Sequence, residues 1–474
     1  MSYRVEKDLL GEMNIPENAY YGIQTMRAAE NFQITGITLT SNPTMICSLA
    51  YVKKAAAITN MKLGHLDEKI GNAIVMACDK ISEGKYNDQF IVDMMQGGAG
   101  TSTNMNANEV IANVALEITG NIKGDYSKIN PNDHVNMSQS TNDAYPTAFR
   151  IALYICIEQL LDSVEMLKKS FRKKENEFSK ILKMGRTQLQ DAVPMTLGQE
   201  FGAYAETIDE DMKRIKEARK LITEINMGAT AIGTGINSHA DYSDIICKEL
   251  RIITGIPLSL SRDFIEATQD TGAYIQVSGV LKRYAVKLSK ICNDLRLLSS
   301  GPRAGFNEIN LPKMQPGSSI MPGKVNPVIP EVVNQVAFQV VGNDLTITMA
   351  AEAGQLELNV MEPVIAFRLF DTINILTNAS LTLSIKCING ITANADVCRY
   401  YVEHSIGLIT ALVPYLGYDV CSEIAKEALK DNRSVYQLVL EKNIISKESL
   451  DIILSPENMA GIRRKKDKGL NGKL

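Results

Sequence analysis

Hydroxyl, amide and lysine side chains gather in one short stretch of the chain, Gly317-Ser-Ser-Ile-Met-Pro-Gly-Lys-Val-Asn-Pro327. Ser318 and Ser319 are adjacent, and Lys324 and Asn326 follow them closely. Its prolines fix their own φ angles, whereas its glycines permit left-handed ones. Such a segment can form a bent loop that presents backbone N–H groups, hydroxyls and one cation to a ligand. These groups together suit a small molecule rich in carboxylate oxygens.

Two simpler interpretations of this stretch are a phosphate-binding P-loop and a surface turn. A P-loop has four residues between its glycines and a Ser or Thr after the lysine. Here five residues separate Gly317 from Gly323, and Val325 follows Lys324, which excludes the P-loop. Gly, Pro, Ser and Asn are common turn residues, so a turn stays possible. A turn does not require two serines, a lysine and an asparagine at once, which favours a functional loop.

Three further clusters of hydroxyl and amide side chains occur earlier, at Thr101–Asn104, Ser140–Asn142 and Thr187-Gln188. Ser, Thr and Asn are the preferred N-caps of helices, which explains one residue at each place but not runs of three. The two roles are compatible, because a helix N-terminus is itself an anion site. The four histidines have no spacing that would build a metal site.

The clusters lie in longer stretches that resemble the motifs of the fumarase/aspartase superfamily, lyases that eliminate a group beside a carboxylate-activated C–H bond. The stretches are Met95–Glu109, Ser138–Thr147, Gly185–Asp191 and Gly317–Pro327. The resemblance covers essentially the whole chain. Within the superfamily, Ala351–Pro363 and Gln139–Asn142 are more similar to the aspartase branch than to fumarases. The resemblance therefore implies reversible elimination of ammonia from L-aspartate to give fumarate, without an organic cofactor; activation by a divalent cation stays open.

The resemblance also implies roles for individual residues. Ser318 matches the general base. A carboxylate beside the lost proton gains a second negative charge in an enediolate-type (aci-carboxylate) intermediate, so the site must aim donors at it. That task falls to Thr101, Ser140, Thr141 and Ser319. Lys324 with Asn326 would hold the other carboxylate, and Asn142 and Thr187 would lie near the amino group, with Gln188 beside them. We expect the loop Gly305–Pro327 to close over the substrate.

Alternatives remain at this point. Fumarases of the superfamily carry His where Gln188 stands, paired with a Glu that matches Glu331, and Gln188 cannot carry a proton. A fumarase, or another lyase of the superfamily, is the second hypothesis. A binding or structural protein that has lost activity is the third, and the presence of Ser318, Lys324, Asn326 and Thr187 argues against it. His134 matches a region that the family links to a second carboxylate site, but it is equally well explained as an ordinary surface histidine.

Composition excludes several other classes. The chain has 474 residues, 45% of them hydrophobic, which is enough for a large core. A formal charge of −4 makes nucleic acid or an anionic membrane an improbable main partner. No apolar run reaches the roughly eighteen residues of a membrane helix, and the first residues have no signal pattern. The eight cysteines are scattered, as in reduced cytoplasmic proteins. The basic run at 463–468 is expected to be a solvated tail.

The periodicity of apolar residues predicts a mainly α fold. We expect a helix through Tyr51–Met61, a loop over Gly97–Asn108 leading into a helix over Asn108–Thr119, and short helices after Gly390. Five long helices are expected over 148–182, 196–226, 268–300, 330–353 and 363–386, which indicates a bundle.

The resemblance implies three domains, at 1–140, 141–395 and 396–474, and a homotetramer whose pooled bundles form one helical core. Successive loops of an up-and-down bundle lie at opposite ends, roughly 45 Å apart for a thirty-residue helix. One chain is therefore not expected to bring all the hydroxyl and amide clusters to one point. The family builds each active site from three subunits.

Overall fold

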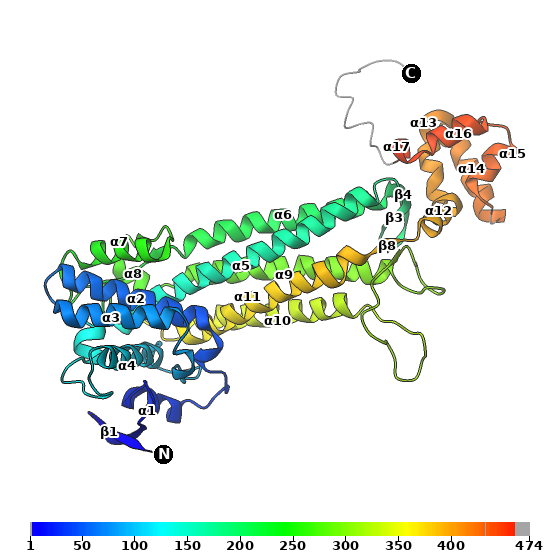
Figure 1. Ribbon diagram of the computed structural model, residues 1–474. Helices are drawn as coiled ribbons and strands as arrows, with labels where there is room; N and C mark the ends of the chain where they lie inside the picture. The colour runs from blue at the N-terminus through cyan, green and yellow to red at the C-terminus, as the bar shows by residue number, and fades with distance from the viewer. Residues whose placement is uncertain (1, 432, 460–474) are drawn as a thin grey trace. The chain divides into compact units, whose positions relative to one another are not determined.

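The computed structural model describes residues 2–431 and 433–459 (Figure 1). The expected basic tail at 463–468 lies outside the described residues. The described chain divides into two compact units. The first comprises the residues up to Asp162, with Met212–Ala285 and Phe338–Thr377. The second comprises Ser163–Asp211, Val286–Ala337 and the residues from Asn378 onward.

The first unit contains the N-terminal hairpin, the shorter helices that precede the long ones, and the short helices between α6 and α9. Strands β1 (Tyr3–Asp8) and β2 (Gly11–Pro16) pair antiparallel. Helices α2, α3 and α4 pack side by side, and α7 packs on α2 (Figure 1). The helices are α1 (Ile23–Asn31), α2 (Pro43–Lys62), α3 (Glu68–Ser82), α4 (Thr101–Ile118), α7 (Tyr242–Thr254) and α8 (Phe264–Gln269). Strands β5 (Glu224–Ile225) and β6 (Ser259–Leu260) pair parallel, and η1 (Leu39–Ser41), η2 (Asn87–Gln89) and the π-helix η3 (Pro131–Val135) complete the list.

All five predicted long helices are present, with ends that differ by up to seven residues from the expected ones. They are α5 (Thr141–Glu177), α6 (Leu197–Leu221), α9 (Gly272–Leu298), α10 (Val328–Glu352) and α11 (Glu362–Lys386). Each contributes one part to each unit. Their apolar stripes are buried as the spacing predicts, for example Phe201, Ile208 and Ile215 on α6 and Val277, Leu281 and Leu288 on α9. A mainly α fold with a bundle of long helices is therefore confirmed.

Polar contacts join the long helices within each unit. In the first, Ser278 of α9 donates to Asp344 of α10 at 2.7 Å, and Asn343 of α10 donates to Thr372 of α11 at 3.0 Å. In the second, Ser170 of α5 shares a 2.8 Å hydrogen bond with Ser384 of α11. Buried polar groups must be paired, so these contacts fix the register of helices whose apolar stripes alone would tolerate sliding.

Pro146 lies inside α5, which begins at Thr141, earlier than the expected start at 148. A proline has no N–H, so the carbonyl of Asn142, four residues earlier, loses its helical partner. The side chain of Asn226 replaces that partner, because its Nδ2 donates to the Asn142 carbonyl at 3.0 Å. The proline is tolerated because a neighbouring loop satisfies the freed group.

The second unit ends in small helices that cover a two-stranded hairpin. Strands β3 (Leu182–Thr187) and β4 (Gln190–Thr196) pair antiparallel, as do β7 (Ile309–Asn310) and β8 (Thr392–Ala393). A core cluster joins Met184 of β3 to Val402, Leu412, Ile424 and Leu438 of the helices. The helices are α12 (Ala395–His404), α13 (Ile409–Leu416), α14 (Tyr418–Asp431), α15 (Val435–Glu441), α16 (Lys447–Ile453) and α17 (Pro456–Met459), with η4 (Ile388–Gly390) and η5 (Ile406–Leu408). The domain limits 1–140, 141–395 and 396–474 stay predictions.

One expected element was wrong. The sequence predicted a loop over Gly97–Asn108, but α4 already begins at Thr101. Its first turns bury asparagines, and these are held by hydrogen bonds, as Asn106 to the Gln89 carbonyl and Asn108 to the Asn136 side chain. Apolar periodicity does not detect helical turns whose buried side chains are largely polar. Within the described residues, no helix has both the length and the apolar character needed to cross a bilayer.

Candidate active site

The loop Gly317–Pro327 closes on itself in the second unit. The Gly317 N–H donates to the Lys324 carbonyl at 2.8 Å, and Asn326 Nδ2 donates to the Gly317 carbonyl at 2.7 Å. A Cβ at Gly317 would lie 2.7 Å from the Asn326 backbone nitrogen. Only glycine therefore allows the two ends of the loop to come this close. Asn326 holds the shape of the loop in this structure.

Ser318 lies within this closed loop and is partly exposed. Its Oγ accepts hydrogen bonds from the backbone N–H groups of Ile320 at 3.2 Å and Met321 at 3.1 Å. Two N–H donors on one oxygen stabilise negative charge there, which is the requirement for a serine that must give up its proton. Ser319 and Lys324 are exposed on the same loop. In the part of the chain that the structure describes, Lys324 has no ion-pair partner.

Thr187 and Gln188 stand at the tip of the β3–β4 hairpin, also in the second unit. Gln188 and Leu189 have φ of 54° and 61°, the left-handed pair that a two-residue hairpin turn requires. Ion pairs join the hairpin to Glu308, which lies in the segment that precedes the loop Gly317–Pro327. Arg186 and Lys183 both contact Glu308, at 2.6 Å and 3.0 Å, and the Glu308 side chain is fully buried.

Thr101 is the first residue of α4, in the first unit. Three consecutive left-handed residues precede it, Gly98, Ala99 and Gly100, with φ of 88°, 55° and 89°. A Cβ on Gly100 would lie 2.5 Å from the ring of Tyr145, so this position also requires glycine. The N-cap residue of α4 is Gly100, which has no side chain that could cap the helix. Thr101, the next residue, is exposed. The turn therefore presents a hydroxyl at a helix N-terminus.

The Ser140–Asn142 cluster forms the start of α5. Ser140 behaves as a cap, because its Oγ accepts from the Asn142 N–H at 3.2 Å and its own N–H donates to Asp143 at 3.0 Å. Asn142 Nδ2 donates to the Ala231 carbonyl at 2.7 Å. Thr141 Oγ accepts from the side chain of Asn104, on the first turn of α4, at 3.3 Å.

Within the first unit, the hydrogen bond from Asn104 to Thr141 thus joins the start of α4, where Thr101 lies, to the start of α5. The second unit carries Thr187, Gln188, Ser318, Ser319, Lys324 and Asn326. Glu331, which stands where fumarases have the partner of their histidine, lies 3.9 Å from Arg296. The Nδ1 of His134 accepts the Asn130 N–H at 2.9 Å in the turn of η3.

Sequence reasoning missed two buried ionisable residues near the start of α5. Lys53 of α2 is fully buried, and so is Asp143. Burial lowers the pKa of Lys53 to about 7 and raises the pKa of Asp143 to about 7. In the sequence Lys53 precedes Lys54, and such a pair is typical of a solvated face. A usable signal was its place between Ala50 and Ala57, on the apolar face of the helix.

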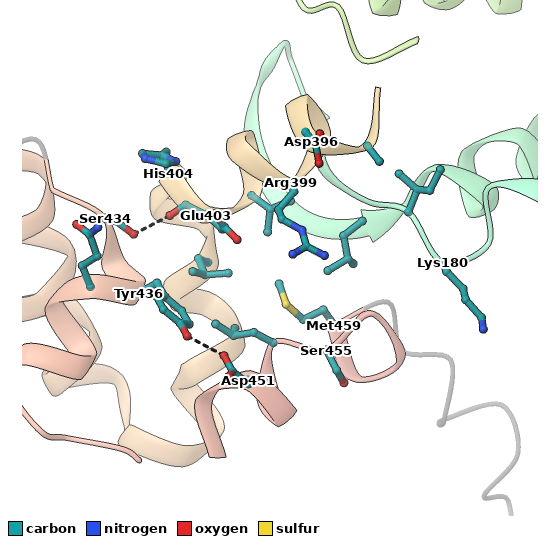
Figure 2. Close-up of a pocket in the computed structure, with 17 residues that line it drawn as sticks. Lys180, Asp396, Arg399, Glu403, His404, Ser434, Tyr436, Asp451, Ser455 and Met459 are labelled. Carbon is teal, nitrogen blue, oxygen red and sulfur yellow. Dashed lines mark hydrogen bonds between the residues drawn. The ribbon is translucent and has the colours of Figure 1, made fainter. Parts of the chain in front are cut away.

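A cavity of about 680 Å³ in the second unit holds none of the predicted site residues (Figure 2). It is lined by residues of α12, α15 and α16 and by the segment before β3. Tyr436 donates to Asp451 at 2.7 Å, and Ser434 donates to the Glu403 carbonyl at 2.9 Å. Because the cavity holds none of the predicted site residues, we do not assign the substrate to it. Among the described residues, no group of three or more His, Cys, Asp or Glu side chains could hold a metal ion.

Comparisons with known proteins agree with the motifs. The family model described as "Lyase" matches residues 11–342, and the model "Fumarase C C-terminus" matches residues 408–461. The chain is 62% identical to the aspartate ammonia-lyase of Helicobacter pylori, over 96% of this chain and 97% of that protein. It is 55% identical to the aspartate ammonia-lyase of Escherichia coli, over 96% of both chains.

Solved structures give the same result. A fumarate lyase:delta crystallin from Brucella melitensis, bound to cobalt, superposes with a TM-score of 0.95 at 54% identity, over 97% of this chain and all of that one. A class II fumarase from Schistosoma mansoni gives a TM-score of 0.91 at 36% identity, over 97% of this chain and 99% of that one. The chain therefore belongs to the lyase family that contains the fumarases and the aspartate ammonia-lyases.

Proposed function

We propose that this lyase is an aspartate ammonia-lyase, which converts L-aspartate reversibly to fumarate and ammonia. The observation that carries the proposal is the Ser318 oxygen, which two backbone N–H groups hold in a loop that also presents Lys324. The Helicobacter and Escherichia relatives, which are 62% and 55% identical to this chain over nearly the full length, are aspartate ammonia-lyases, which supports the choice of substrate.

In the proposed reaction Ser318 acts as the general base. Its ionised oxygen takes a proton from the carbon beside one carboxylate, and the electron pair of that C–H bond moves into the carboxylate to form an enediolate-type intermediate. The pair then returns to form the double bond as the C–N bond breaks and the ammonium group leaves as ammonia. The N–H groups of Ile320 and Met321 stabilise the negative charge of the ionised oxygen.

The remaining site residues bind the substrate. Thr101, Ser140, Thr141 and Ser319 donate to the carboxylate that gains charge. Lys324 binds the other carboxylate, and Asn326 keeps the loop in the shape that presents it. Asn142, Thr187 and Gln188 lie near the amino group. This chemistry needs no organic cofactor, because the carboxylate of the substrate itself accepts the electron pair.

A class II fumarase is the second candidate, because the Schistosoma enzyme shares the fold. Its hydration chemistry transfers water, which requires a group that can carry a proton. Gln188 at the hairpin tip cannot do so. Ammonia leaves an ammonium group as a neutral molecule and needs less assistance, which favours aspartate.

We also propose that the protein is a homotetramer with active sites shared between subunits. Helix α10 exposes a stripe of large apolar side chains, with Phe338 68%, Leu345 62% and Met349 65% exposed. They recur at helical spacing and therefore form one face of the helix. Exposure of such an apolar face to water is unfavourable. Further copies of the chain would cover it. A cytoplasmic location fits the eight cysteines, all of which are free thiols.

The direct test is product formation. The purified protein with L-aspartate should produce fumarate, seen by the ultraviolet absorbance of its conjugated double bond, and an equal amount of ammonia. Absence of both products under conditions where the protein is folded would contradict the proposal.

A further inference from the structure

Lys53 is the one lysine of α2 whose charge is removed completely from water, at 0% exposure. Its ammonium group makes three hydrogen bonds, to Asn104 Oδ1 at 2.7 Å, Asn136 Oδ1 at 2.9 Å and Gln139 Oε1 at 2.9 Å. A buried charge is costly unless it is fully hydrogen-bonded, and here all three N–H groups are used. The three acceptors come from α4, from the end of η3 and from the segment before α5.

The ammonium group can only donate, and this fixes the direction of each amide that it contacts. Because Asn104 must turn its oxygen toward Lys53, its Nδ2 faces away from Lys53. That Nδ2 donates to Thr141 Oγ at 3.3 Å and to Asn136 Oδ1 at 3.1 Å. Since the Thr141 oxygen accepts this hydrogen bond, its own hydrogen is free to point elsewhere. The chain Lys53–Asn104–Thr141 therefore leaves Thr141 as a donor toward the substrate side.

We propose that Lys53 is a positioning residue for the substrate dicarboxylate, and that it acts by setting the donor direction of the hydrogen-bond chain that ends at the Thr141 hydroxyl. Its charge also adds positive potential to the carboxylate subsite at Thr141. Burial lowers the pKa of Lys53, and the nearby Asp143 carboxylate opposes this shift because it favours the cation. The inference rests on the proposed function, because it takes Thr141 to be a substrate contact.

Two substitutions test the hydrogen-bond chain Lys53–Asn104–Thr141. Lys53→Met removes the donor and keeps the length of the side chain. Asn104→Asp keeps the shape and the acceptor for Lys53 but places an oxygen where Nδ2 stood, so that Thr141 must donate inward. Lys54→Met is the matched control, because Lys54 is the next residue of α2 and pairs with Asp79 at 2.5 Å instead. Measured quantities are kcat and KM for L-aspartate, Kd for the unreactive dicarboxylate succinate, and the thermal unfolding midpoint.

We expect Lys53→Met and Asn104→Asp each to lower kcat/KM and to weaken succinate binding by at least about tenfold. Lys54→Met should leave both within about twofold. Asn104→Asp should fold even if Lys53→Met does not, because the new carboxylate pairs with the buried ammonium. A purely structural role for Lys53 predicts instead that Asn104→Asp, if folded, binds succinate normally, and this result would overturn the inference.

Thr141→Val provides the second readout, since it removes the hydroxyl but keeps the shape. If the chain acts through Thr141, Asn104→Asp should have little further effect in the Thr141→Val background. If the losses of succinate affinity caused by Asn104→Asp and Thr141→Val were fully additive, the two residues would act independently. That result would contradict the hydrogen-bond chain and would leave charge repulsion as the explanation for Asn104→Asp. Failure of the wild-type protein to bind succinate or to deaminate aspartate would instead remove the proposed function, together with this inference. Normal wild-type behaviour with unaffected variants would remove the inference alone.

Discussion

Gly317→Ala should disrupt the closed loop Gly317–Pro327 without unfolding the protein. The added Cβ would lie 2.7 Å from the Asn326 nitrogen and 2.8 Å from the Lys324 carbonyl oxygen, whereas ordinary contacts begin at 3.4 Å. Relief of the clash requires the two ends of the loop to separate by about 0.7 Å, which stretches the 2.8 Å hydrogen bond from Gly317 to Lys324 to its limit. The 2.7 Å bond from Asn326 to the Gly317 carbonyl is weakened with it.

Together these two hydrogen bonds are worth about 2 kcal/mol, so the population of the ordered loop should fall by about 30-fold. We expect kcat/KM for L-aspartate to fall by a similar factor, measured from initial rates of fumarate absorbance. The thermal unfolding midpoint should change little, because the loop is largely exposed and lies outside the core.

Gly323→Ala is the matched control in the same loop. Gly323 has φ of +83° and no heavy atom within 4 Å of an added Cβ, so alanine there meets strain but no clash. That strain costs about 1 kcal/mol, which corresponds to about a fivefold loss. Equal effects of the two substitutions, or a Gly317→Ala variant within about threefold of wild type, would refute the view that the closed loop shapes the site.

Three further predictions concern the site and the assembly. Ser318→Ala should lower kcat by at least about 100-fold with little change in succinate affinity or fold, and a near-native kcat would show that the base lies elsewhere. Lys324→Ala should mainly raise KM, because it removes an ion pair that the substrate already makes before reaction, and an unchanged KM would exclude Lys324 from the carboxylate subsite. Inactive Ser318→Ala and inactive Thr141→Ala chains, unfolded and refolded together, should regain part of the activity. Each variant refolded alone is the control, and mixed tetramers as inactive as the controls would contradict shared sites.

The long helices could be predicted because their signal is local and repeated. Apolar residues three and four apart are buried together whenever a helix packs on one face, as Phe201 and Ile208 do on α6. The start of α4 could not be predicted this way, because its first turns bury several asparagines. Their hydrogen-bond partners, such as the Gln89 carbonyl for Asn106, are not visible in the sequence.

The candidate site shows the same division between local and distant information. The motifs around Thr101, Thr141 and Ser318 indicated hydroxyl donors. Lys53 was missed because its burial depends on Asn136 and Gln139, more than eighty residues away along the chain. Glu308 was missed for the same reason, since Arg186 and Lys183 reach it from a distant hairpin. A charged residue is buried only where the fold supplies partners, and no local pattern reports those partners.

The most direct test of the central claim compares L-aspartate with L-malate as substrates of the same purified protein. Both give fumarate, so one absorbance measurement yields kcat/KM for each under identical conditions. Because Gln188 stands where hydration would need a proton carrier, we predict that aspartate is deaminated and that malate is not dehydrated at a comparable rate. Turnover of malate as fast as or faster than that of aspartate would contradict the assignment and make the protein a fumarase.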